Sequence, residues 1–148
     1  MFQHILVPLD GSGPSRLALG KAAALARLTG ARVTVVAVVD THLFPHGGGE
    51  LTEHETEFIQ SAVANAGQML EDAQAELRAQ GVACERSLLQ GHVVHEGILH
   101  AARECGADLI AMGSHGRHGL EKLLLGSTAQ RVLAHATVPV LAVRGDGE

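Results

Sequence analysis

The sequence predicts an α/β fold, a single doubly wound domain with a five-stranded parallel sheet and helices on both of its faces. Short runs rich in β-branched residues alternate with longer helical patterns along the chain. The connections between them are short, which is typical of helices that cross back over a parallel sheet. Ala, Val and Leu supply most of the 46% of hydrophobic residues, which suits closely packed layers. We expect residues 1–148 to form one domain.

Five segments have the length and composition of buried strands. The five strands favour a flavodoxin-like sheet over the six-stranded dinucleotide fold, and we expect the spatial order 3-2-1-4-5. In that order the first and fourth strands are neighbours where the strand order reverses, and ligands of such folds bind there. The predicted strands are 5–9, 32–39, 82–89, 109–112 and 138–143.

The first predicted helix has clear start and stop signals. Ser12 is a capping residue, and Pro14 follows where its missing N–H does no harm. Gly30 is placed to end the helix in the left-handed conformation. Similar glycines bound the next two helices, which we expect over 52–80 and 93–104. The longer of these carries an apolar stripe at helical spacing: Phe58, Ile59, Ala62, Val63, Ala66, Leu70, Ala73 and Leu77.

A glycine series near the C-terminus is the most informative feature of the chain. It begins directly after the fourth predicted strand, at Gly113, continues through Gly116, and ends at Gly126-Ser127, where a further helical pattern starts. Glycines let backbone N–H groups approach a ligand closely. A helix that begins at Ser127 directs free N–H groups and its positive dipole end at an anion. The series therefore predicts a phosphate cradle, and so a nucleotide site.

A second signal lies after the first predicted strand, at Asp10-Gly11-Ser12. Because the first and fourth strands are expected to be neighbours, this turn and the glycine series meet at the same edge of the sheet.

With these residues assembled, the chain resembles the universal stress protein family. The nucleotide signature of this family is a glycine, any two residues, a second glycine, any nine residues, and then a third glycine followed by Ser or Thr. In this chain these positions are Gly113, Gly116, Gly126 and Ser127. The resemblance extends to the segments 5–12, 112–116 and 138–144, and so across the whole chain.

The resemblance implies an ATP-binding protein with an α/β fold. It implies that Asp10 contacts the adenosine part and that the backbone around Val38 contacts adenine. It also implies that the glycines of the signature and Ser127 hold phosphates, with His115 touching ribose or phosphate. Arg117 is a further candidate, because a cation beside Gly116 neutralises phosphate charge. The full candidate set is Pro8, Asp10, Val38, Met112, Gly113, His115, Gly116, Arg117, Gly126, Ser127 and Thr128.

Two simpler interpretations of these residues stay open. The glycines could serve only turns and caps, and Asp10 could cap the first helix through the N–H groups that follow it. His118, with Arg117 and Lys122, is interpreted as a solvated rim rather than as acid–base machinery.

The ten histidines raise the question of a metal site, above all His42, His46 and His54 with Glu50 or Glu53. Their spacing matches no zinc pattern, so a solvated loop is preferred, and Mg²⁺ carried with ATP is the expected ion. Cys105 is interpreted as a buried thiol rather than a redox sensor, and no disulfide framework is expected from the two cysteines.

Two related α/β folds and two other nucleotide-binding motifs are excluded by particular residues. A phosphoacceptor domain needs an aspartate where this chain has Leu89-Gln90, and a flavodoxin needs aromatic rings, while Tyr and Trp are absent. Arg16 stands where a dinucleotide fingerprint has its third glycine, and no P-loop follows any predicted strand.

Two functions of different classes remain. The first is an ATP-binding regulatory module of the stress response, with little or no turnover, whose bound state is read by an unknown protein partner. The alternative is a slow ATPase or phosphotransferase. Phosphoryl transfer needs a positioned base and charge clamps, and only Arg117 is a candidate cation. We therefore assign no catalytic residue and prefer the binding module.

Charge and hydropathy limit the partners. The net charge of −5 gives no basic footprint for nucleic acid, and no apolar run reaches the ~20 residues of a membrane helix. The start of the chain lacks a signal-peptide pattern, so we expect a cytoplasmic protein. The segment 138–143 is apolar on both faces and contains Pro139, which suits an edge strand. We expect a homodimer paired through this edge, as the family also suggests.

Overall fold

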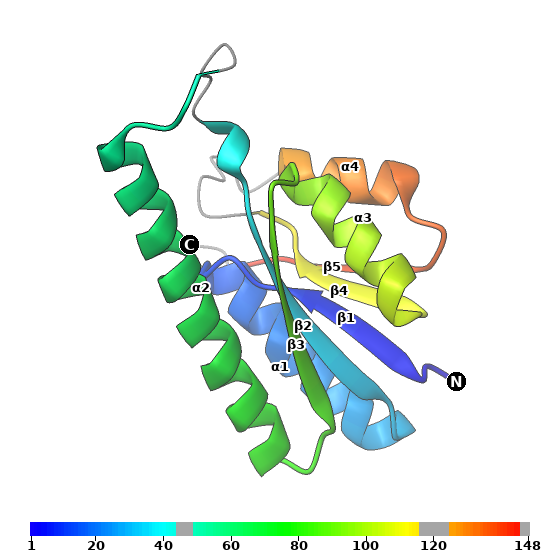
Figure 1. Ribbon diagram of the computed structural model, residues 1–148. Coiled ribbons are helices and arrows are strands. Elements are labelled where there is room, and N and C mark those ends of the chain that lie inside the picture. Colours follow the sequence, from blue (N-terminus) through cyan, green and yellow to red (C-terminus); the bar gives the residue numbers. More distant parts are fainter. Residues whose placement is uncertain (44–48, 116–124, 146–148) are drawn as a thin grey trace.

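The computed structural model describes residues 1–43, 49–115 and 125–145. Five parallel strands form one sheet in the order β3-β2-β1-β4-β5, as predicted (Figure 1). β1 is central and pairs with β2 on one side and with β4 on the other. The strand order therefore reverses between β1 and β4. The strands are β1 His4–Pro8, β2 Arg32–Val39, β3 Cys84–Gln90, β4 Leu109–Gly113 and β5 Val140–Val143.

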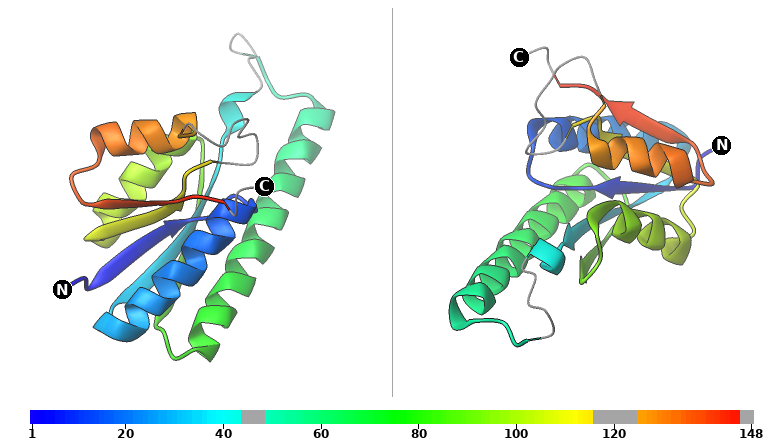
Figure 2. Two further views of the ribbon diagram at one scale, coloured as in Figure 1. Left: turned by 180° about the vertical axis from the view of Figure 1, so that it is seen from behind. Right: turned by 90° about the horizontal axis from the view of Figure 1, so that it is seen from above.

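Four α-helices cover the two faces of the sheet within the described residues (Figure 2). Side chains alternate along a strand, so Ile5 and Val7 pack into one core with α1 and α2, while Leu6 packs into the other core with α3 and α4. This two-layer burial explains why the strand segments are almost continuously apolar. The helices are α1 Gly13–Thr29, α2 Glu53–Ala79, α3 Val94–Cys105 and α4 Ser127–His135, with a 3₁₀ turn η1 at Thr41–Leu43.

The predicted signals of α1 are confirmed. Ser12 is its N-cap and accepts a hydrogen bond of 3.2 Å from Ser15 N–H, and a proline lies in the first turn. Gly30 ends the helix with φ of 76°. At α2, Thr52 and Glu55 form a reciprocal capping box, which fixes the helix start one residue after the predicted one.

Two strands begin later than predicted, for local reasons. Val82 N–H donates to Leu77 O at 3.0 Å, so residue 82 closes the end of α2 instead of entering β3. β5 begins at Val140 rather than at residue 138, because Pro139 has no N–H for a ladder. The carbonyl of Pro139 still accepts from Ile110 N–H at 3.0 Å.

The apolar stripe of α2 is buried only in its C-terminal half. Leu70 and Leu77 are 2% and 1% exposed, whereas Phe58 is 55% exposed. The N-terminal turns of α2 extend past the carboxyl ends of the strands (Figure 1). They therefore stand beside the predicted ligand site rather than over the core. Among the described residues, no helix has the length and apolar character needed to cross a membrane.

Candidate functional site

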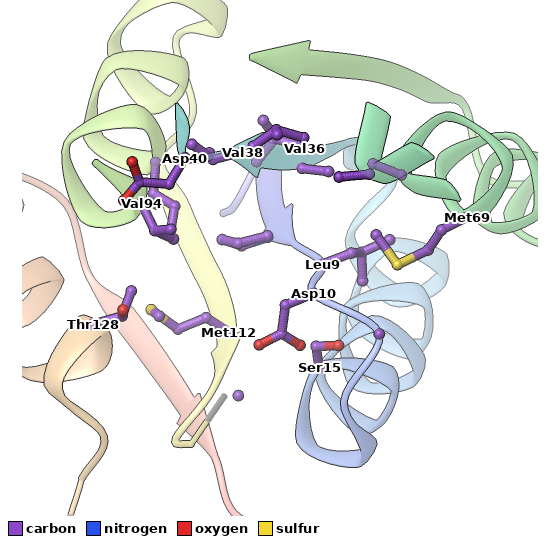
Figure 3. Close-up of a pocket in the computed structure, with 18 of the residues that line it drawn as sticks. Leu9, Asp10, Ser15, Val36, Val38, Asp40, Met69, Val94, Met112 and Thr128 are labelled. Carbon is purple, nitrogen blue, oxygen red and sulfur yellow. The ribbon is translucent and has the colours of Figure 1, made fainter. Parts of the chain in front are cut away.

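A cavity of about 880 Å³ lies at the carboxyl ends of β1, β2 and β4, where the strand order reverses (Figure 3). Its size is in the range of ligand pockets. Nine of the eleven candidate residues line it: Pro8, Asp10, Val38, Met112, Gly113, His115, Gly126, Ser127 and Thr128. The other two, Gly116 and Arg117, lie outside the described residues, as do His118, Lys122 and His46. The sheet thus brings together candidates that are far apart in sequence.

Asp10 lies just beyond the carboxyl end of β1, and its side chain lies beside those of Ser15 and Met112 (Figure 3). Its Oδ1 atom accepts a hydrogen bond of 2.9 Å from Ser12 N–H, across Gly11, whose φ is +82°. The cap of α1 is the side chain of Ser12, so the interpretation of Asp10 as that cap is wrong. Asp10 instead holds the turn that precedes the helix and presents a carboxylate to the cavity.

Gly113 has a packing role that the sequence did not indicate. A Cβ atom on Gly113 would lie 2.8 Å from Pro14 Cβ and 2.9 Å from Ser15 N. Contacts this short do not occur between real side chains and backbone, so the end of β4 meets the first turn of α1 only because residue 113 has no side chain. Any side chain at residue 113 would therefore force the end of β4 and the first turn of α1 apart.

The turn after β4 is tied to its surroundings by Ser114, which is fully buried. Its N–H donates to Val143 O at 2.8 Å, and its carbonyl accepts from Gly126 N–H at 2.7 Å. Its hydroxyl is hydrogen-bonded to His115 Nδ1 at 3.1 Å. The two ends of the glycine series are therefore joined through Ser114, which was not among the candidates.

His115 presents a buried polar atom to the site. Its Nε2 atom is shielded from solvent and has no hydrogen-bond partner within the described part of the chain. Buried polar atoms in proteins are nearly always hydrogen-bonded. The free ring nitrogen therefore makes His115 a candidate for contact with a ligand.

The N-terminus of α4 also faces the cavity. Its N-cap is Gly126, which has no side chain to accept from the first helical N–H groups. These groups have no acceptor within the helix either, because their partners would precede its start. With φ of −65° and ψ of 158°, Gly126 is in a conformation open to any residue. The first turn thus offers N–H groups and a positive dipole end to an anion.

The wall opposite the glycine series is aliphatic, and part of it was missed. Val38 was a candidate, but Val36, Val94 and Ile98 complete the same wall. They lie on the α3 and α4 side of the sheet, as does Met112. Parallel strands end at one edge, so the residues next to each strand end could have been included on that ground.

Asp40, which directly follows β2, was also missed. It lines the cavity, and its Oδ1 atom accepts from His42 N–H at 2.8 Å and lies 3.1 Å from His42 Nδ1. His42 therefore has a local partner. Within the ranges the structure describes, no three His, Cys, Asp or Glu side chains are arranged to hold a metal ion.

Neither cysteine belongs to the site. Cys84 is buried and Cys105 half-buried, and both are free thiols. Burial raises the pKa of the Cys84 thiol to about 11 and also raises the pKa of Cys105. Both therefore stay protonated and unreactive at neutral pH, in agreement with the interpretation of Cys105 as a packed thiol.

Comparison with known proteins gives a consistent family. The model of the universal stress protein family matches residues 1–144. Universal stress protein YxiE of Bacillus subtilis is 37% identical over 150 residues, which cover 97% of this chain and all of YxiE.

Two solved structures resemble the chain along its length. The structure of MJ0577, a Methanocaldococcus jannaschii universal stress protein, has a TM-score of 0.83 and 31% identity over 97% of this chain and 96% of its own. A universal stress protein from Archaeoglobus fulgidus in complex with dAMP has a TM-score of 0.65 and 26% identity over 96% and 98% of the two chains. The family match, the strand order and the intact glycine signature agree, and the chain belongs to the universal stress protein family.

Proposed function

We propose that this protein is an ATP-binding regulatory module, with little or no turnover, whose nucleotide state is read by a partner. The observation that carries the proposal is the meeting of nine candidate residues with the uncapped start of α4 in one cavity. An anion-binding end and an aliphatic wall suit the two ends of a nucleotide. The complex of the Archaeoglobus relative with dAMP supports an adenine nucleotide as the ligand.

In the proposed arrangement the phosphates lie against Gly113, Gly126 and the first turn of α4. The base lies against the end of β2 at Val38, and Asp10 accepts a hydrogen bond from the adenosine part. The carboxylate suits this role because it only accepts hydrogen bonds when ionised, and ribose hydroxyls donate them. Mg²⁺ would arrive with the phosphates, since it keeps water and phosphate ligands and needs few from protein.

Binding without turnover is preferred because of the chemistry of the lining. None of the described lining residues is a lysine or an arginine. Phosphoryl transfer needs cations that stabilise charge in the transition state. A slow ATPase would therefore depend on Arg117 and on the metal, with His115 as the nearest group able to move a proton.

Calorimetric titration of ATP with Mg²⁺ into nucleotide-free protein, followed by overnight assay of ADP, tests this function. We expect stoichiometric binding at micromolar or tighter affinity with almost no ADP. Continued ADP production at an enzyme-dependent rate would favour the slow ATPase. Absence of binding would contradict both forms of the proposal.

We also propose that two copies pair through β5. β5 is an edge strand of the sheet, and Leu141 on it is 41% exposed, while Val140 and Val143 are partly exposed. An apolar edge with unpaired backbone groups is stabilised by pairing with a second copy. A cytoplasmic location stays a prediction from the sequence.

A further inference from the structure

Gly97 of α3 lies against Val38 at the end of β2. A Cβ atom on Gly97 would be 2.8 Å from both Cγ1 and Cγ2 of Val38, and 3.2 Å from His92 Cβ. Two other helical glycines, Gly20 and Gly67, have nothing within 4 Å of the same position. Gly97 is buried, and its lack of a side chain sets how closely α3 approaches β2.

This contact is directly behind the aliphatic wall of the cavity. Val38 lines the cavity, and so do Val94 and Ile98, which flank Gly97 on α3. Figure 3 shows Val38 and Val94 at the same side of the cavity. Gly97 itself is not part of the lining, so it acts on the cavity only through these neighbours.

Val38 cannot accommodate a larger residue 97 by changing rotamer. Its two γ carbons occupy two of three staggered positions, and both face Gly97 at the same distance. Rotation of the Val38 χ1 angle to either of the other staggered rotamers moves one methyl group away from Gly97. The other methyl group then still occupies one of the two positions that face Gly97. Any side chain at residue 97 therefore has to displace the end of β2, or α3 with Val94 and Ile98.

We propose that Gly97 is a positioning residue for the base-binding wall: the absent side chain holds Val38 where a purine can lie against the end of β2. The inference rests on the proposed function, in which the nucleotide base contacts Val38. It adds a residue outside the cavity that determines whether the base fits. It also predicts that the effect is transmitted chiefly by the 2.8 Å contact between residue 97 and the γ carbons of Val38, rather than by the looser 3.2 Å approach to His92 Cβ.

Gly97→Ala tests the proposal, with Gly67→Ala as the matched control. Both substitutions add one methyl group to a helix, and alanine favours the helix at each position, which offsets part of the crowding at residue 97. We expect Gly97→Ala to bind ATP and AMP each about tenfold more weakly. The ratio of the two affinities stays unchanged because the phosphate end is not disturbed. Gly67→Ala is expected to bind both nucleotides like the wild type.

Rescue separates positioning from general damage. In a Val38→Ala background the colliding methyl groups are gone, so adding Gly97→Ala should change AMP affinity by no more than about twofold. If Gly97→Ala alone does not fold, the comparison of Val38→Ala with the double variant still tests the proposal. A double variant that fails to fold, or that binds AMP much more weakly than Val38→Ala, overturns the proposal.

The remaining outcomes distinguish this inference from the proposed function. A wild-type protein that binds neither ATP nor AMP overturns both. If the wild type binds and folded Gly97→Ala has unchanged affinities, only the role of Gly97 is wrong. A change in the ratio of the ATP and AMP affinities would mean that residue 97 disturbs the phosphate end, which also contradicts the proposal.

Discussion

The carbonyl oxygen of Ser114 accepts a hydrogen bond of 2.7 Å from Gly126 N–H, which joins the turn after β4 to the start of α4. This bond holds the two ends of the glycine series together and leaves the next N–H groups of α4 directed at the cavity. It uses only backbone atoms, so a side chain at either residue can be changed without removing it.

Gly126→Val is therefore expected to abolish ATP binding and to leave the fold intact. The φ of −65° at residue 126 suits any residue, and the N–H that bonds Ser114 is retained. A branched side chain at the N-cap would cover the N–H groups proposed to hold phosphate. Calorimetry for ATP and the midpoint of thermal unfolding check this. Unaltered ATP affinity in a folded Gly126→Val protein would contradict the assignment of the phosphate site to the start of α4.

Gly113→Ala is expected to lower stability, unlike a substitution at Gly126. The new Cβ would meet Pro14 and the backbone of Ser15, and overpacking of this kind costs about 1–3 kcal/mol. Gly20→Ala, in open space on α1, is the matched control and should stabilise the fold by up to about 1 kcal/mol. Urea unfolding of the two variants measures the difference. Equal free energies of unfolding would contradict the close packing at residue 113.

His4 makes the fold less stable in mild acid. Its Nε2 atom lies 2.7 Å from Thr34 Oγ1, and Arg32 Nε donates to its Nδ1 atom at 3.2 Å, so the buried ring is held neutral. Burial lowers the pKa of His4, and the Arg32 charge lowers it further. Below the usual pKa of 6.5 the unfolded chain binds a proton that the folded protein resists. Stability is therefore complete above that pH and falls as the pH drops towards the folded pKa.

His4→Gln should remove that part of the pH dependence. The measurement is the free energy of unfolding at about pH 7.5 and about pH 5.5, where an unperturbed histidine changes charge. The wild type should lose more stability between these values than His4→Gln does. Titration of Asp108 does not affect this comparison. Partial burial raises the pKa of Asp108, but hydrogen bonds from the N–H groups of His4 and Gln3 outweigh burial, so the pKa is lowered overall. Asp108 therefore changes the stability only in stronger acid than the two pH values compared. The same loss in both proteins would show that other groups are responsible.

Leu141→Lys is expected to convert the proposed dimer into a monomer. Leu141 is 41% exposed on the edge strand, and a charge there disfavours pairing of two edges. Light scattering during size-exclusion chromatography at micromolar concentration measures the mass. Lys21→Leu, on the exposed surface of α1, is a control that should keep the mass of the wild type. A monomeric wild type would contradict the dimer itself.

Much of the fold could be predicted from the sequence because its signals are local. Ser12 caps α1 and Gly30 ends it through groups a few residues away, and strands that are buried on both faces are continuously apolar. Strict alternation of strands and helices then left few possible topologies. The glycine series, read with the turn at Asp10, was sufficient to predict the edge of the sheet at which the cavity lies.

The close packing between elements and the full lining of the cavity depended on contacts between segments that are distant in sequence. Periodicity and local signals do not encode such contacts. Only the tertiary structure brought Gly113 against Pro14, and Gly97 against Val38. It also placed Asp40 and the N-terminal half of α2 in the cavity lining, where a pattern of apolar residues looked like ordinary core. The sequence by itself determined which elements form and at which strand ends the cavity lies. The distances at which those elements pack, and thus which glycines have no room for a side chain, were decided by tertiary packing, because side-chain volume acts between neighbours in space.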